Sequence, residues 1–326
     1  MNKFVDMKHI SILVPHYVNL AGFENPRQGL QETNELLISK GRAPIFDINI
    51  VGENKEMKSY DGQISIWVDR LISEIDKTDL IIIPPVHNVI AEALKANHRL
   101  YPWICEQRQK GAHIVSLCLG TFLLAKTGLL DNKKCVTHWR AGDSFRRLFP
   151  KAILLSDKIL TDEDGIYTGG GAFSSANLIL YLIEKLVDRE TAIYCSKIFQ
   201  IDVGRNSQSP FIIFSAQKNH NDEQVIKAQN FIEQNYFSKI SVDDLCDYSG
   251  IGRRTFERRF KKATANTVIE YVQRTRIEVA KKEFELGVKT LSEIMYDVGY
   301  NDPKAFRNVF KRVTGLYPVD YKERFN

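Results

Sequence analysis

The chain has 326 residues, a hydrophobic content of 44% and a net charge of +5 at pH 7. This length exceeds one ordinary domain, so two domains are expected. The five cysteines are odd in number and widely spaced, which excludes a disulfide framework and indicates a reducing cytoplasm. No signal-like N-terminal run and no stretch approaching the roughly 20 apolar residues of a membrane span are found. We therefore expect a cytoplasmic protein without membrane contact, bound metal or cofactor.

The first two thirds of the chain alternate apolar runs with helical patterns. Strands are predicted at residues 10–14, 44–51, 80–83 and 114–117. Helices are predicted at residues 26–39, at 89–109 with an interruption at Pro102, and at 121–126, while 64–75 indicates a strand followed by a helix. This alternation predicts a doubly wound α/β sheet.

Cys118 is the residue of most chemical interest in this part of the chain. It follows the strand at 114–117 and precedes the helix at 121–126, which is the arrangement of a nucleophile elbow. The N-terminus of the following helix would stabilise a thiolate at this position. The alternative is a small buried residue without chemistry, since cysteine often packs in this way.

Several other side chains are expected near Cys118, because open α/β sheets bind ligands at the carboxyl ends of their strands. His138 could pair with the thiolate as a Cys–His couple, or it could be a hydrogen-bonded structural histidine. The Gly-rich segment 168–175 lacks the Lys-Ser/Thr of a phosphate loop, so a nucleotide is not expected. The candidate pocket residues are His16, His87, Cys118, His138, Gly169 and Gly170.

The last third of the chain contains two copies of one helix-turn-helix pattern, a first repeat at residues 241–264 and a second repeat at 290–314. Ser241 and Thr290 are N-cap types, each followed three residues later by an acid, which resembles a capping box. A glycine then allows the left-handed conformation that ends a helix. The matching pairs are Leu245 with Ile294, Gly250 with Gly299, Phe256 with Phe306, and Phe260 with Phe310.

The second helix of each repeat is predicted to turn a polar face outward. Phe256 and Phe260 lie four residues apart and share the buried face, so the opposite face is charged. Arg and Asn can contact guanine and adenine edges in the major groove, and Glu can accept from cytosine. A solvated charged face is the alternative, but two copies at one spacing favour double-stranded DNA. The candidate DNA-binding residues are Arg254, Glu257, Arg258, Lys261, Lys304, Arg307, Asn308 and Lys311.

Residues 267–286, between the repeats, have helical apolar spacing and no Gly or Pro. They predict one rigid linker helix, which would fix the distance between two reading heads. Heads that enter successive major grooves must lie about 34 Å apart, one turn of DNA.

Residues 222–326 resemble the DNA-binding domain of the AraC family, through both repeats, the linker helix and the closing segment Gly315 to Phe325. In that closing segment Lys322 stands where the family usually has Arg. The resemblance implies that the outer faces of the two second helices contact bases.

The segment around Cys118, with residues 121–131 and Thr137 to Trp139, resembles the PfpI-like fold. The combination is similar to GlxA-like regulators, which implies a sensor or dimerisation domain at 1–205, a linker at 206–221 and a DNA-binding domain at 222–326. Active PfpI-like members carry a Glu soon after the first strand. The segment Val14 to Leu20 has no acid, and Glu24 follows in a predicted loop, so catalysis by Cys118 is not expected.

These observations predict a transcription regulator that binds promoter or operator DNA. Its first domain is expected to sense a small-molecule effector, to form a homodimer, or both. The alternative is a Cys-dependent PfpI-like enzyme, an amidase or glyoxalase-like protein, with an accessory DNA-binding domain. A third hypothesis is a regulator whose first domain only dimerises.

Overall fold

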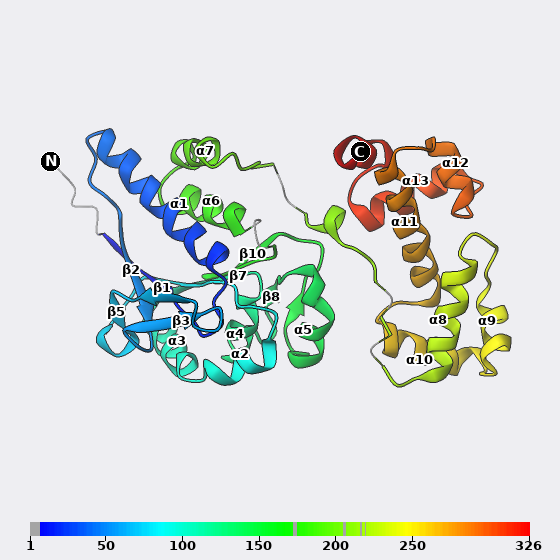
Figure 1. Ribbon diagram of the computed structural model, residues 1–326, viewed down its shortest axis with the longest axis horizontal. Helices are drawn as coiled ribbons and strands as arrows, with labels where there is room; N and C mark the ends of the chain where they lie inside the picture. Colours follow the sequence, from blue (N-terminus) through cyan, green and yellow to red (C-terminus); the bar gives the residue numbers. More distant parts are fainter. Residues whose placement is uncertain (1–6, 172–174, 205–206, 216, 219) are drawn as a thin grey trace. The chain divides into compact units, whose positions relative to one another are not determined.

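The computed structural model describes residues 7–171, 175–204, 207–215, 217–218 and 220–326. The chain forms two compact units, an N-terminal unit, Met1–Gln208, and a C-terminal unit, Ser209–Asn326 (Figure 1). Residues 206, 216 and 219 of the predicted linker and residues 172–174 of the Gly-rich segment lie outside the described residues.

A seven-stranded sheet runs through the N-terminal unit in the order β10-β11-β7-β6-β1-β2-β5. Neighbouring strands are parallel except for the antiparallel pair β10 and β11. The strands of this sheet are β1 (Lys8–Leu13), β2 (Phe46–Gly52), β5 (Arg70–Leu71), β6 (Leu80–Ile83), β7 (His113–Leu117), β10 (Leu160–Glu163) and β11 (Ile166–Gly169). Two small two-stranded sheets consist of β3 (Glu56–Ser59) with β4 (Ile64–Trp67), and β8 (Lys134–Cys135) with β9 (Ile153–Leu154).

Helices cover both faces of this sheet, which confirms the predicted doubly wound α/β domain (Figure 1). In β6, Leu80 and Ile82 enter one apolar cluster, whereas Ile81 and Ile83 enter the other, as the twofold period of a strand requires. On one face lie α1 (Leu20–Ser39), α6 (Ser175–Leu186) and α7 (Arg189–Ile198); on the other lie α2 (Ile90–Ala96), α3 (Leu100–Gln109), α4 (Gly120–Lys126) and α5 (Gly142–Leu148).

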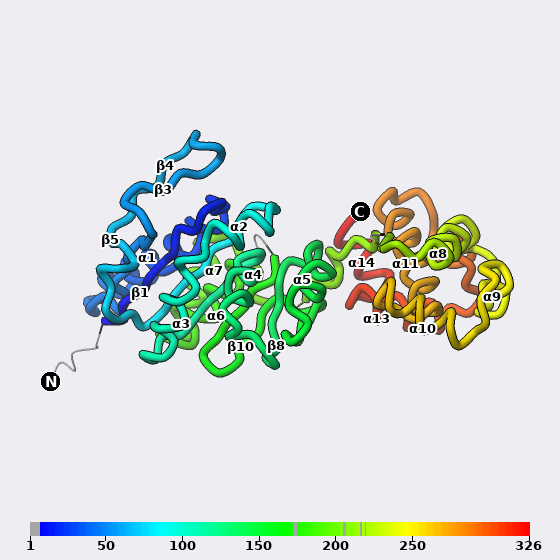
Figure 2. The backbone as a smooth tube through the Cα atoms, turned by 90° about the horizontal axis from the view of Figure 1, so that it is seen from below, coloured from blue at the N-terminus to red at the C-terminus, as the bar shows by residue number. Residues whose placement is uncertain are grey.

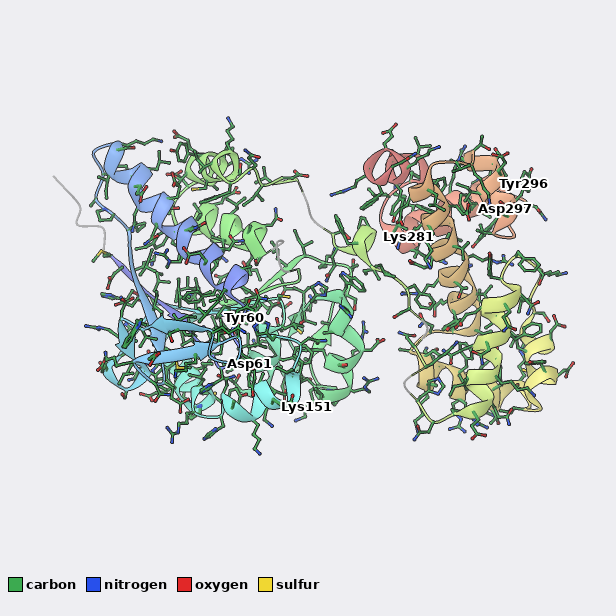
Figure 3. The ribbon with its side chains drawn as sticks, viewed as in Figure 1. Tyr60, Asp61, Lys151, Lys281, Tyr296 and Asp297 are labelled. Atoms are coloured by element: carbon green, nitrogen blue, oxygen red, sulfur yellow. The ribbon has the colours of Figure 1, made fainter. Side chains whose placement is uncertain are left out.

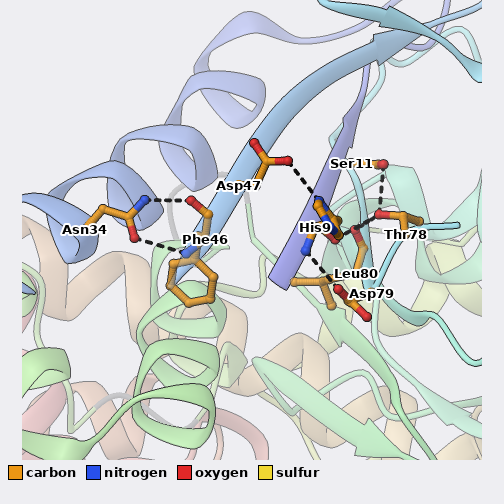
Figure 4. Close-up of polar contacts among 8 residues, drawn as sticks. All are labelled: His9, Ser11, Asn34, Phe46, Asp47, Thr78, Asp79 and Leu80. Carbon is orange, nitrogen blue, oxygen red and sulfur yellow. Dashed lines mark hydrogen bonds and ion pairs between the residues drawn. The ribbon is translucent and has the colours of Figure 1, made fainter. Parts of the chain in front are cut away.

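Polar side chains fix the start of the first strands (Figure 4). Asn34 of α1 donates to the backbone oxygen of Phe46 at 2.8 Å and accepts from its N–H at 3.1 Å, so it acts like a neighbouring strand. The N–H of His9 donates to Asp79 at 2.8 Å, and the Thr78 hydroxyl donates to the His9 oxygen at 2.9 Å. These bonds hold α1 against β2, and they hold β1 against the residues that immediately precede β6.

Three predicted helix boundaries are wrong. α1 begins at Leu20, six residues before Pro26, because the Asn19 side chain accepts from the Gly22 N–H at 3.3 Å and caps the helix there. The segment 89–109 breaks at Asn97 to Arg99, since Asn97 turns its side chain to the Ala93 oxygen, whereas Pro102 lies in the first turn of α3, where proline is tolerated. The helix expected within 64–75 is only the 3₁₀ turn Ile72–Glu74.

The C-terminal unit is helical throughout its regular structure and contains both repeats, as predicted. Its helices are α8 (Glu223–Asn235), α9 (Val242–Ser249), α10 (Arg253–Thr264), α11 (Val268–Leu286), α12 (Leu291–Asp297), α13 (Pro303–Thr314) and α14 (Pro318–Phe325). One core surrounds α8 to α10 and includes Tyr271 of α11, and a second surrounds α12 to α14 and includes Phe284 of α11. The predicted linker helix therefore contributes one end to each core.

The apolar segment Phe211 to Phe214 packs on this unit. The Phe214 N–H donates to Glu278 at 3.0 Å, and Lys281 donates to the Ile212 oxygen at 2.6 Å. Only 4% of the Lys281 side chain is exposed, and it pairs with Glu278 at 2.9 Å. Figure 3 labels Lys281 on α11. The beginning of the C-terminal unit is therefore held to α11 by hydrogen bonds to both members of an ion pair within that helix. Within the described ranges, no helix is long and apolar enough to cross a membrane.

Candidate nucleic-acid interface and candidate ligand pocket

Each repeat begins with the capping box that the sequence predicts. The Asp244 N–H donates to the Ser241 hydroxyl at 3.1 Å, and the Ser241 N–H donates to the Asp244 carboxylate at 3.1 Å. Thr290 and Glu293 make the equivalent pair, and the bond from the Thr290 N–H holds the pKa of Glu293 below its usual value. A third box, Thr267 with Glu270, starts α11 and was missed, although T-x-x-E is visible in the sequence.

The turn of each repeat depends on a left-handed glycine. Gly250 has φ 67° and Gly299 has φ 80°, in a region where other residues are strained. The helix that follows, α10 or α13, then buries the predicted phenylalanine pair. Phe256, Phe260, Phe306 and Phe310 have no exposed surface.

The outward faces of α10 and α13 carry all eight candidate DNA-binding residues, and each of these residues is exposed. Glu257 lies 3.5 Å from Arg253, and the Lys311 ammonium lies 4.0 Å from the centre of the Tyr317 ring. Among the described residues, no hydrogen bond or ion pair engages the guanidinium groups of Arg254, Arg258 and Arg307. These three groups are thus free to bind another molecule.

The two second helices face the same side of the C-terminal unit. Figure 2 shows α10 and α13 along one edge of this unit, with α8 on the opposite edge. The arrangement presents two basic helix faces in one direction, as two neighbouring major grooves would require.

Cys118 occupies the sharp turn between β7 and α4, as predicted. Its φ is 54°, its N–H donates to the Gly169 oxygen at 2.7 Å, and its own oxygen accepts from the Thr137 hydroxyl at 2.9 Å. The side chain is only 5% exposed, and burial raises the pKa of the thiol to about 12. Burial raises this pKa more than the hydrogen bond from the Leu119 N–H lowers it, which favours the buried-residue alternative for Cys118.

The three candidate histidines make separate local contacts. His138 accepts from the Arg140 N–H at 3.2 Å, and burial, together with the nearby Arg140 charge, lowers its pKa. Nε2 of His16 lies 3.7 Å from Glu53. The His87 ring packs edge-on against Tyr60 at 4.6 Å, and its buried Nε2 has no partner within the described residues.

No Cys–His couple is formed in the described part of the chain, since no hydrogen bond joins Cys118 to His138. Glu24, expected in a loop, lies in α1 and pairs with Arg27 at 2.8 Å. The structure thus joins Gly169 to Cys118 through a backbone hydrogen bond, and Thr137, the neighbour of His138, binds the Cys118 oxygen.

Gln208 is a functional candidate that sequence reasoning missed, because it lies in the predicted linker. It is 1% exposed, and its amide donates to the backbone oxygens of Thr137 at 3.2 Å and Lys158 at 3.0 Å. A Cβ on Gly170 would lie 2.9 Å from that amide nitrogen, so a larger residue there would have to displace the Gln208 side chain. Gln208 therefore packs against the Gly-rich segment that follows β11.

The fold and these sites define a two-part chain, an α/β domain with a cysteine elbow joined to paired helix-turn-helix repeats. Residues 8–185 match the DJ-1/PfpI family, and residues 245–324 match a helix-turn-helix domain. The chain belongs to the DJ-1/PfpI family and carries an AraC-type helix-turn-helix region.

Proteins named as transcriptional regulators are similar to about two thirds of this chain. The chain is 23% identical to the HTH-type transcriptional regulator GbdR of Pseudomonas aeruginosa over 218 residues, which are 67% of this chain and 59% of GbdR. It is 21% identical to the HTH-type transcriptional regulator GlxA of Rhizobium meliloti, over 66% of each chain. The alignments thus span less than two thirds of the length of these relatives. A crystal structure of an AraC family transcriptional regulator from Pseudomonas putida shares the fold, with a TM-score of 0.51 at 16% identity, covering 59% of this chain and 99% of that chain.

Proposed function

We propose that the protein is a sequence-specific DNA-binding transcription regulator. The observation that carries this proposal is the pair of exposed faces on α10 and α13, with Arg254, Arg258 and Arg307 unengaged within the described residues. Arg is suited to bidentate contact with guanine, and Asn308 to contact with adenine. The helix-turn-helix relatives support the same conclusion.

The N-terminal unit acts in this proposal as a sensor of a small molecule, as a homodimerisation domain, or as both. The candidate pocket comprises the backbone at Gly169 and Gly170, the Cys118 elbow, and the histidines His16, His87 and His138. Cys118 is assigned no catalytic role, because burial raises the pKa of its thiol and the segment Val14 to Leu20 offers no acid. The relatives named as regulators point the same way.

A short segment of the chain connects the candidate pocket to the C-terminal unit. Gln208 packs against Gly170, and six residues later Phe214 is bound to Glu278 of α11. A ligand can shift DNA affinity only by the difference between its affinities for two states, typically a factor of about 5–150. DNA must then change ligand affinity by the same factor.

A genome-wide footprint of the protein on its own DNA tests the function, and promoter sites with a shared motif are the expected result. Ligands that raise the melting temperature of residues 1–208 would then be titrated into the full chain with and without the footprinted DNA. Equal ligand affinity in both titrations would contradict the sensor role and leave dimerisation as the role of the N-terminal unit.

The absence of catalysis is tested with Cys118→Ser. The variant is expected to regulate its promoter like the unchanged protein. Turnover of an amide or dicarbonyl substrate that disappears in Cys118→Ser would contradict the proposal and support the enzyme alternative.

A further inference from the structure

The two helix-turn-helix repeats have separate cores, and α11 is the element they share. Val268, Tyr271 and Val272 of α11 belong to the first core, and Ile277, Ala280 and Phe284 belong to the second. The stretch between these groups, Gln273 to Arg276, contributes to neither core. On one side of this stretch lies a groove of about 500 Å³, lined from both repeats, and the exposed side chains of Phe237 and Tyr296 are part of its lining. Figure 3 labels Tyr296.

All three guanidinium nitrogens of Arg276 donate to backbone oxygens where the two repeats meet. Nε donates to the Tyr236 oxygen at 2.7 Å, and Nη2 donates to the Ser238 oxygen at 2.7 Å; both oxygens belong to the loop that enters the first repeat. Nη1 donates to the Gly299 oxygen at 3.1 Å, in the turn of the second repeat. The guanidinium also lies 5.2 Å from the centre of the Tyr300 ring.

Gly299 brings the same two segments into direct contact. A Cβ at this position would lie 2.5 Å from the Phe237 oxygen, so the turn of the second repeat touches the loop of the first through bare backbone. Arg276 therefore bridges two backbone segments that are already in contact, beside the Tyr236 and Tyr300 rings that pack with the second core.

We propose that Arg276 is a positioning residue that sets the spacing and angle between the two reading heads. The inference rests on the proposed DNA-binding function and adds a structural determinant of which operators are read. The planar fork of Arg satisfies three carbonyls in fixed directions, whereas a Lys ammonium keeps the charge but has no such fork. Two linked heads gain affinity through effective concentration, and that gain falls when their geometry is loosened.

The test uses the full chain, DNA sites selected by the unchanged protein from a random pool, and the same sites with one base pair inserted between the half-sites. One base pair moves a half-site by about 3.4 Å and rotates it by about one tenth of a turn. The unchanged protein should bind the inserted site at least about tenfold more weakly than the optimal site. This loss of affinity is smaller than the gain that linking two binding modules can give.

Arg276→Lys should lower the affinity for the optimal site about tenfold and leave the affinity for a single half-site almost unchanged. The preference of this variant for the optimal site over the inserted site should therefore be smaller than that of the unchanged protein. Arg274→Lys, the same change on an exposed position of α11 whose guanidinium lies 5.9 Å from the centre of the Phe214 ring, should keep the full preference. Two results would contradict the positioning role. Arg276→Lys could keep the site preference of the unchanged protein, or it could lose as much affinity for single half-sites as for the optimal site.

The unchanged protein also gives an answer that does not depend on how well a variant folds. If it prefers a bipartite site but tolerates an inserted base pair without loss, the heads are not fixed and the positioning role is wrong. If it prefers no selected site to random DNA, the proposed function itself fails.

Discussion

The two repeats are built on the same plan but use one matched residue differently. Gly250 and Gly299 both end a helix in the left-handed conformation. A Cβ at Gly250 would meet nothing within 4 Å, whereas one at Gly299 would collide with the Phe237 oxygen. The shared glycine thus forms the turn in both repeats, and in the second repeat it also joins the two halves of the domain.

The outward faces of the two repeats also differ in chemistry. The first carries Glu257 among three basic residues, and the second carries Asn308 in the corresponding set. Different side chains read different bases, so we expect an asymmetric operator with two unlike half-sites.

The largest effect should be equal in both repeats. Phe260→Ala and Phe310→Ala each remove a fully buried ring, which typically costs about 3–5 kcal/mol. Urea unfolding of the C-terminal unit, followed by circular dichroism, measures both losses. A loss in one repeat below half of that in the other would show that the two cores are not equivalent.

Replacing the matched glycines Gly250 and Gly299 should destabilise the two repeats to different extents. Gly250→Ala adds left-handed strain of about 1–2 kcal/mol. Gly299→Ala adds the same strain and also a backbone collision, so its loss in unfolding free energy should be clearly the greater. Equal midpoints for the two variants in a urea titration would contradict the close contact with Phe237.

The arginines of the outward faces should change binding and leave folding intact. Arg254→Ala and Arg258→Ala should each weaken the specific site by about 1–3 kcal/mol if a base contact is lost. Lys282→Ala, on an exposed position of α11, serves as the control. Fluorescence anisotropy on specific and random DNA measures the effect, and unchanged binding of both variants to both DNAs would exclude these residues from the interface.

The smallest effect concerns how the second helices begin. Asp302 caps α13 by accepting from the Lys304 N–H at 2.9 Å, whereas Gly252 precedes α10 without a side-chain cap. Asp302→Gly makes the second repeat begin like the first and should cost only a few tenths of a kcal/mol, since glycine is a tolerated cap. Thermal unfolding measures this loss, and a cost above that of Asp302→Ala would contradict the capping role.

The buried thiol of Cys118 adds a pH dependence to the N-terminal unit. Because its pKa is raised from the usual 9.0 to about 12, its contribution to stability is complete below pH 9 and is lost as the pH rises toward 12. Alkylation at pH 8 should therefore be slow in the folded protein. Rapid modification of Cys118 at that pH would show an accessible thiolate.

Local patterns predicted much of this molecule, because their causes are local. The capping residues at Ser241 and Thr290, the left-handed glycines and the phenylalanine pairs follow from spacings of three or four residues. The short apolar runs of β1, β6 and β7 are strands buried on both faces, which alternate between two apolar clusters.

Other features depend on residues distant in sequence, and no local pattern contains them. At the break after α2, the Asn97 amide donates both to the Ala93 oxygen and to the oxygen of His16, 81 residues away. The raised pKa of the Cys118 thiol reflects burial within the folded domain, which outweighs the local hydrogen bond from the Leu119 N–H. Arg276 looks like one more charge on a helix until its partners, up to 40 residues away, are known.

The central claim is that two heads of fixed separation read DNA together. Repeated selection of the full chain on a random DNA pool, followed by sequencing, tests it most directly. The account predicts two unlike short motifs whose centres lie about 10–10.5 base pairs apart, one helical turn. Enrichment of a single motif, of two motifs at variable spacing, or of no motif would contradict it.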